Sequence, residues 1–318
     1  MTITLRRGAM GLAALATLAL VGCSSNGVSM NRPAGAILQA ANQQALGSSF
    51  QMTFTSQLQV HLHGVTATGV ASGELSLVQA EIDSARLRGV IQLQSPTQFE
   101  MSFTLTPLLT QTWHVLDLSG KEYISENGTQ WHTVSNLKSS AASSSGGLSN
   151  LKAEVKSWGQ ALRSEATVTN LGKTTISSNQ VEHLQTTLTG SDLNHSLAGI
   201  LGQVAGQLGT AGSSLSADLP AVEKLLQFTS VKEDSYVRTS TGQLARVHLT
   251  VGLSLDLSEL SSLAPGQLGL PAGSASMTFT STGNFSDYSK DFGLQKPSNI
   301  VPGPLPTPNG LAGALSQT

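Results

Sequence analysis

Residues 50–62 read FQMTFTSQLQVHL, in which apolar and polar side chains alternate almost throughout. Successive side chains of a β-strand point to opposite faces of a sheet, so a period of two predicts a strand with one apolar face. The alternation returns at 244–257, LARVHLTVGLSLDL, where it is strictest. Such one-faced strands are typical of an antiparallel sheet, because buried parallel strands have continuous apolar runs.

The same pattern predicts further strands along most of the chain. Gly64 reads as a break after the first strand, and the alternation resumes over 65–77. Asn127-Gly128, a strong hairpin signal, predicts a tight turn within 122–134. The remaining predicted strands lie near 85–93, 99–105, 113–118, 166–171, 181–189 and 275–285.

Helices are needed to cover the apolar face of this sheet. Apolar residues at helical spacing predict helices near 34–46, 150–163, 193–208 and 219–227. A large twisted sheet curls. We therefore expect an α+β fold: a single curved antiparallel sheet, or half-barrel, wrapped around a few α-helices.

The N-terminus predicts export and lipid attachment. Arg6 and Arg7 precede an apolar run over 9–21, which is too short to span a bilayer and is typical of a signal peptide. The run ends in Leu20-Val21-Gly22-Cys23, which matches the bacterial lipobox, whose cysteine thiol takes a diacylglyceryl group. Cys23 is the only cysteine, so we expect lipidation there and no disulfide. An ordinary secretory peptide with a stray or buried cysteine is the alternative.

This start divides the chain into four parts. We expect a signal peptide at 1–22, a tether at 23–33, the half-barrel domain at 34–300 and a disordered, proline-rich tail at 301–318. Two acyl chains on Cys23 suffice for stable membrane attachment without a transmembrane helix.

Charge and motifs argue against nucleic-acid binding and catalysis. Lys and Arg number 17 against 19 Asp and Glu, a net charge of -2 without a basic patch for nucleic acid. His61 and His63 lie on the polar face of their strand, with no further ligand at metal spacing. No nucleophile elbow or phosphate loop occurs. We expect no enzyme, metal or cofactor.

The apolar face has two interpretations that remain open: its side chains pack against helices, or some of them line a cavity for an apolar ligand. Glycines 199, 202, 206 and 209 would leave one face of the helix near 193–208 bare, as in a mobile lid or a flexible surface loop. The cavity candidates are Phe54, Leu58, Leu87, Ile91, Phe99, Met101, Phe103, Leu201, Val204, Leu249, Leu253 and Phe279.

Three short motifs carry a resemblance to a known family. They are Tyr123-Ile124 with Gly128-Thr129-Gln130-Trp131, Leu171-Gly172-Lys173 followed by Val181-Glu182-His183-Leu184, and Gly242-Gln243-Leu244-Ala245-Arg246-Val247. With the lipobox and the order of elements, they resemble the mycobacterial LppX/LprG-type lipoproteins and, more distantly, the LolA/LolB lipoprotein-carrier superfamily. The Ser/Gly-rich stretches near 139–150 and 209–217 depart from that pattern.

The resemblance implies a non-catalytic envelope lipoprotein. Such a protein binds a lipid or lipidated ligand in an apolar cavity between sheet and helices, and transport of that ligand is a further expectation. Its expected location is the outer face of the cytoplasmic membrane, or the periplasm or outer membrane if the host has one. The alternative is a structural or protein-interaction lipoprotein that binds no lipid.

Overall fold

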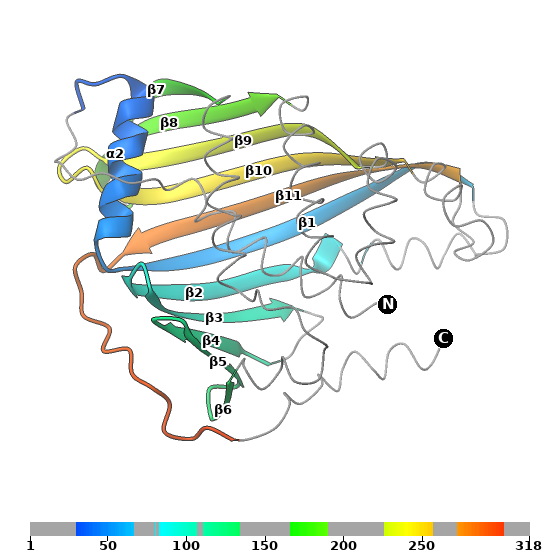
Figure 1. Ribbon diagram of the computed structural model, residues 1–318. Helices are drawn as coiled ribbons and strands as arrows, with labels where there is room; N and C mark the ends of the chain where they lie inside the picture. The colour runs from blue at the N-terminus through cyan, green and yellow to red at the C-terminus, as the bar shows by residue number, and fades with distance from the viewer. Residues whose placement is uncertain are drawn as a thin grey trace.

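The computed structural model describes residues 30–66, 80, 83–106, 111–133, 166–189, 226–256 and 272–301. Its strands form one 11-stranded antiparallel sheet with the order β6-β5-β4-β3-β2-β1-β11-β10-β9-β8-β7 (Figure 1). The strands are β1 (Phe50–Thr66), β2 (Arg86–Ser95), β3 (Gln98–Thr106), β4 (Trp113–Leu118), β5 (Lys121–Glu126), β6 (Gln130–Thr133), β7 (Thr167–Ile176), β8 (Asn179–Thr189), β9 (Leu226–Arg238), β10 (Leu244–Asp256) and β11 (Ala272–Ser286). The expected fold class, a single curved antiparallel sheet with a few α-helices, is confirmed, and one of these helices lies within the described residues.

The first and last strands of the sheet are neighbours. β1 pairs with β11 from Gln51–Ser286 to His63–Ser274 in an unbroken antiparallel register. A meander, β1 to β6, extends from this pair on one side, and a second meander, β11 back to β7, extends on the other. The predicted hairpin at Asn127-Gly128 joins β5 to β6, and both residues have the positive φ that this turn requires.

Several sequence predictions need correction. Gly64 does not end the first strand, because β1 continues to Thr66 with only a register shift after His63. The prediction of a helix at 219–227 is wrong for its last two residues, because Leu226 and Gln227 begin β9. The whole of β9 was not predicted. The helices expected at 150–163 and 193–208 lie outside the described residues, as do 219–225 and most of the strand expected at 65–77.

Helix α2 (Ala34–Gly47) confirms the helix predicted at 34–46 and crosses one end of the sheet (Figure 1). Alanine, leucine and glutamine favour this helix, and the Pro33 carbonyl accepts the first hydrogen bonds, from the Ala36 and Ile37 N–H groups. We call the side of the sheet that contacts α2 the inner face. Its first cluster of buried side chains is Ile37, Leu38, Ala41, Ala45, Phe50, Met52, Phe54, Leu87, Ile91, Leu93, Leu184, Val237, Leu244, Val247 and Phe285.

Two glycines of the inner face let large side chains lie across neighbouring strands. A Cβ atom on Gly89 would overlap the Ser102 carbonyl oxygen and lie 2.6 Å from Cζ of Phe54. A Cβ atom on Gly283 would lie 2.8 Å from Sδ of Met52. At Gly89 the clash includes a backbone oxygen, so the position of Phe54 depends on glycine there. At Gly283 the flexible Met52 side chain would have to shift.

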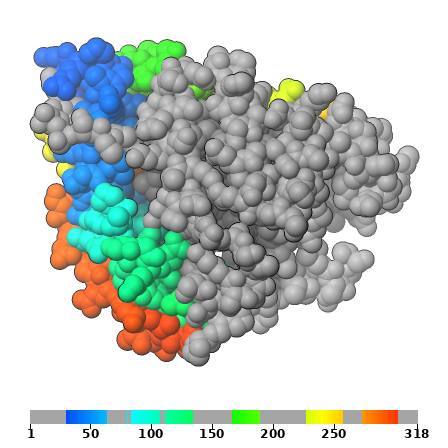
Figure 2. All heavy atoms as spheres, viewed as in Figure 1, coloured from blue at the N-terminus to red at the C-terminus, as the bar shows by residue number. Residues whose placement is uncertain are grey.

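The C-terminal segment closes one edge of the sheet. The Trp131 N–H of β6 donates to the Asn299 carbonyl at 3.0 Å, and the Val301 N–H donates to the Trp131 carbonyl at 2.9 Å. This segment runs from the end of β11 along the margin of the molecule to β6 (Figures 1 and 2). Edge strands otherwise present unpaired backbone groups, so the chain protects this edge itself.

Within the described ranges, no helix has the length and apolar character needed to cross a bilayer.

Gly89→Ala should destabilise the protein, because its new methyl group meets a backbone oxygen and the Phe54 ring. We expect a loss of about 1–3 kcal/mol of unfolding free energy, measured by urea denaturation. Gly47→Ala, at the end of α2 with no atom within 4 Å of the new Cβ, is the matched control and should be neutral or slightly stabilising. Equal stability of the two variants would contradict this account.

Candidate functional site: the inner face beyond the helix

The predicted cavity residues within the described ranges lie on the inner face. The register places them there together: Leu58 pairs with Phe279, Ile91 with Met101, and Leu87 with Leu105. Leu201 and Val204 lie outside the described residues, as do Cys23 and the glycines of the expected lid. The period of two therefore predicted that these side chains share one face of the sheet, and the register confirms it.

These residues divide into two groups by their packing. Phe54, Leu87 and Ile91 belong to the first cluster, and Phe99, Met101 and Phe103 pack against it. Leu249 belongs to a second cluster with Leu188 and Val231, against which Ala166, Phe228, Val251 and Phe279 pack. Leu58 and Leu253 are half-buried and pair with Phe279 and Phe228, beside the second cluster. The first group belongs to the core that includes α2, and the second cluster contains no residue of α2.

Polar side chains lie between the two clusters. One row across the sheet contains Thr186, Glu233, Leu249, Ser281 and Ser56, each the register partner of the next. The Ser56 hydroxyl donates to the Ser281 hydroxyl at 2.8 Å, and both side chains are buried. On β8, Thr186 separates Leu184 of the first cluster from Leu188 of the second.

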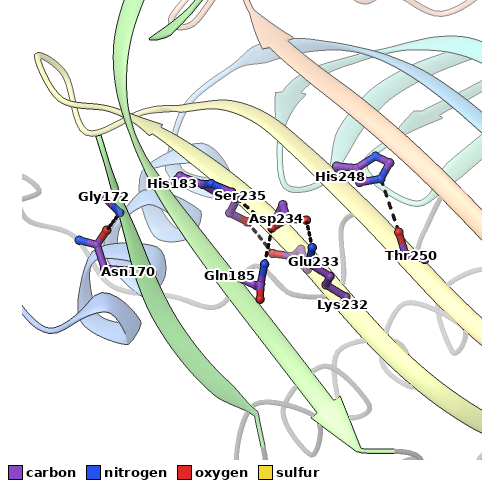
Figure 3. A network of polar contacts seen from close by, with 10 residues as sticks. All are labelled: Asn170, Gly172, His183, Gln185, Lys232, Glu233, Asp234, Ser235, His248 and Thr250. Atoms are coloured by element: carbon purple, nitrogen blue, oxygen red, sulfur yellow. Dashed lines mark hydrogen bonds and ion pairs between the residues drawn. The ribbon is translucent and has the colours of Figure 1, made fainter. Parts of the chain in front are cut away.

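Glu233 is a buried carboxyl group in this row, with 3% of its surface exposed. Its Oε1 accepts a hydrogen bond of 2.6 Å from the Ser235 hydroxyl (Figure 3). Burial raises the pKa of Glu233 to about 7, opposed by the Ser235 hydrogen bond and assisted by the nearby charge of Asp234. The carboxyl group therefore titrates near neutral pH.

Thr186 pairs directly with Glu233 on the neighbouring strand. Its hydroxyl is buried and has no hydrogen-bond partner among the residues that the structure describes. A buried hydroxyl without a partner is rare, because it loses its hydrogen bonds to water and gains none in return. Neither residue stands out in the sequence, because charged residues hide the period of two in β9 and Thr186 is one of several polar positions on β8.

The opposite, outer face of the same strands carries a polar network whose side chains bond Asp234. Asp234 Oδ1 lies 2.8 Å from His183 Nε2 and accepts a hydrogen bond of 2.9 Å from Gln185 Nε2 (Figure 3). Lys232 Nζ lies 3.2 Å from Asp234 Oδ2. Burial alone would raise the pKa of Asp234, but these three partners outweigh it and lower that pKa. The His183 ring stacks on Tyr236 with centroids 4.5 Å apart. This network holds β8 to β9.

Other parts of the described chain offer less. His61 and His63 are exposed on the outer face of β1, and no group of three His, Cys, Asp or Glu in the described ranges could hold a metal. A hollow of about 300 Å³ on the outer face is lined by Gln51, Val90, Gln92, Glu100 and Ser102. Another of about 170 Å³ lies at the β5–β6 hairpin. Neither hollow involves a predicted cavity residue.

Comparison with known proteins returns solved structures only. No protein-family model matches the chain, and no curated protein matches its sequence. Similar structures include lipoprotein LppX of Mycobacterium tuberculosis, at 10% identity over 78% of this chain and 89% of that one, with a TM-score of 0.28. LprF of Mycobacterium bovis matches at 10% identity over 86% and 99% of the two chains, with a TM-score of 0.34.

A LolA-superfamily protein of Nitrosomonas europaea matches at 11% identity over 81% of this chain and 93% of that one, with a TM-score of 0.22. These structures come from the LppX and LolA groups that the sequence motifs resemble. At this identity and overlap, the similarity carries no conclusion about the ligand or activity of this chain.

The pKa of Glu233 predicts a pH-dependent stability. The folded state holds the proton more tightly than the unfolded chain, whose glutamate titrates near 4.5. The resulting stabilisation is complete below pH 4.5 and is lost as the pH rises through about 7. Between pH 5 and pH 8 the wild type should lose on the order of 3 kcal/mol more unfolding free energy than Glu233→Gln, measured by urea denaturation.

Glu126→Gln controls for the removal of one carboxylate elsewhere, at the end of β5. Parallel pH profiles for the wild type and Glu233→Gln would refute the burial of an ionisable group at this position.

Proposed function

We propose that this chain is a lipoprotein of the cell envelope, anchored to the membrane through Cys23, that binds acyl chains on the inner face of its sheet beyond α2. The ligand is a lipid or a lipidated molecule, and the protein carries this ligand through the envelope. The protein sits on the outer side of the cytoplasmic membrane, or in the periplasm or outer membrane of a host that has them. Binding, without a catalytic step, is the whole of this proposed activity.

The observation that supports binding is the second cluster. Leu188, Val231 and Leu249 gather on the same face as the core under α2, yet no residue of α2 belongs to this cluster. An apolar chain laid against it would gain about 0.8 kcal/mol for each buried methylene group. Half-buried side chains at the margin, Phe228, Val251 and Phe279, extend the apolar surface.

The anchor is supported by the lipobox. Leu20-Val21-Gly22-Cys23 follows an apolar run with a basic start, and the thiol is the only one in the chain. An acylated cysteine would hold the domain at the membrane surface through residues 24–33, close to its source of lipid.

A structural or protein-interaction lipoprotein remains the second candidate. It is favoured by the packing of six predicted cavity residues into or against the first cluster, as in an ordinary core. The two candidates differ in whether an acyl chain enters the inner face, so a binding measurement separates them.

Phe279→Glu should abolish or strongly weaken lipid binding, because it places a charge in the path of the acyl chain. The full chain carrying Cys23→Ala, which cannot be acylated, serves as the background for titration with fluorescent fatty acids and for native mass spectrometry. We expect at least tenfold weaker binding for Phe279→Glu. Thr278→Glu, the neighbouring position on the opposite face of β11, is the matched control and should bind like the background protein. If the Cys23→Ala background and Thr278→Glu both take up no lipid, the structural candidate holds.

Cys23→Ala should also remove the anchor in a bacterial host. Mass spectrometry of the mature wild-type protein should find an N-terminal cysteine carrying acyl chains, and membrane fractionation should find it with the membrane. The variant should lack the acyl mass. An unmodified thiol on the wild-type protein would eliminate the lipoprotein assignment while leaving the binding proposal to its own test.

A further inference from the structure

Two buried polar side chains face each other on the inner face, next to the buried Ser235. Thr186 and Glu233 are register partners, so their Cβ atoms lie about 5 Å apart on one side of the sheet. Apolar residues surround them: Leu184 and Leu188 on β8, Val231 on β9 and Leu249 on β10. Both polar side chains are at least nine-tenths buried.

Their hydrogen-bonding capacity is only partly used. Glu233 Oε1 accepts from Ser235, and no described residue bonds the Thr186 hydroxyl. A protonated carboxyl group can donate one hydrogen bond, and a threonine hydroxyl can donate another. Two donors on adjacent strands can converge on one acceptor oxygen that is brought in by a ligand.

The charges around the pair indicate what kind of acceptor fits. No Lys, Arg or His in the described ranges pairs with or immediately flanks Thr186 or Glu233 on the inner face. Lys232 and His183 point to the outer face, where both bond Asp234, and α2 contains no charged residue. The remaining charged side chains on these strands lie further away. They are Arg238 at the end of β9, which donates to the Leu244 and Phe285 carbonyls, Arg246 and His248 on the outer face of β10, Asp256 at the end of β10, Glu182 further along the inner face of β8, and Lys173 on β7.

An ionised headgroup would therefore meet a carboxyl group and no cation, which is unfavourable in an apolar setting. An uncharged carbonyl oxygen needs only donors. The geometry points to a hydrogen-bonding site at Thr186 and Glu233 that binds the carbonyl oxygen of an uncharged acyl ester, whose chain lies along the second cluster. This inference rests on the proposed function and specifies where the polar part of the ligand binds.

The protonation of Glu233 would then control binding. The protonated carboxyl group donates to the ester oxygen, whereas the carboxylate repels it. Burial raises the pKa of Glu233 to about 7, so the carboxyl group loses its proton, and with it the hydrogen-bond donor, as the pH rises through neutral. Ester binding should weaken as the pH rises from 5.5 to 8.5.

The test uses the full chain with Cys23→Ala and the neutral fluorescent probe N-phenyl-1-naphthylamine, displaced by methyl laurate or by dodecane. Thr186→Val should weaken displacement by methyl laurate about three- to tenfold at pH 5.5 and leave displacement by dodecane unchanged. Glu233→Gln, which keeps a neutral donor, should bind methyl laurate equally at both pH values. Thr187→Val, on the exposed outer face of β8, is the matched control.

The outcomes separate this inference from the proposed function. If the probe binds but Thr186→Val retains the wild-type preference for the ester over dodecane, the polar site is refuted and acyl-chain binding stands. Pairing of Thr186 with Glu233 alone, without a ligand, would give that result. If the probe does not bind the wild-type chain at all, both proposals fail. Loss of the ester preference in Thr186→Val together with a flat pH profile in Glu233→Gln supports the site.

Discussion

The fold depends on keeping one face of a wide sheet apolar across every strand pairing. Side chains alternate between faces, so a slip of one residue in any pair would move a strand's apolar set to the solvent side. The long β1–β11 register, from Gln51–Ser286 to His63–Ser274, fixes this alignment at the centre of the sheet. The position of α2 follows from it, because the helix covers the end where Phe50, Met52 and Phe285 come together.

Four buried polar side chains, Thr186, Glu233, Ser281 and Ser56, interrupt this apolar face in a row that also contains Leu249. The first cluster includes residues of α2 and holds the domain together, and the second cluster includes none. A buried carboxyl group works against stability in such a place, and proteins tend to break local rules of this kind where function requires it. The outer network around Asp234 shows the contrast: there each charge has a partner, and the pKa of the carboxyl group falls instead of rising.

Most of the strands could be predicted because their period of two is visible without knowledge of the fold. β9 could not, because Lys232, Glu233, Asp234 and Ser235 interrupt the apolar pattern, and two of these polar residues point inward. The face of the cavity candidates was predictable for the same reason as the strands. Which of them join the cluster that contains α2 was not, because that depends on where the helix lies on the sheet, as Phe54 and Leu249 illustrate.

The two edges of the sheet have different prospects for association between copies of the chain. The backbone N–H and carbonyl of Trp131 in β6 are both bonded to the 299–301 segment, so at this residue they cannot pair with a strand of a neighbouring molecule. Among the described strands, β7 lies at the other end of the order and is the edge that remains for such addition. Two molecules joined through β7 would have protected β6 margins at both ends, so such growth stops at a pair and does not continue into a fibril.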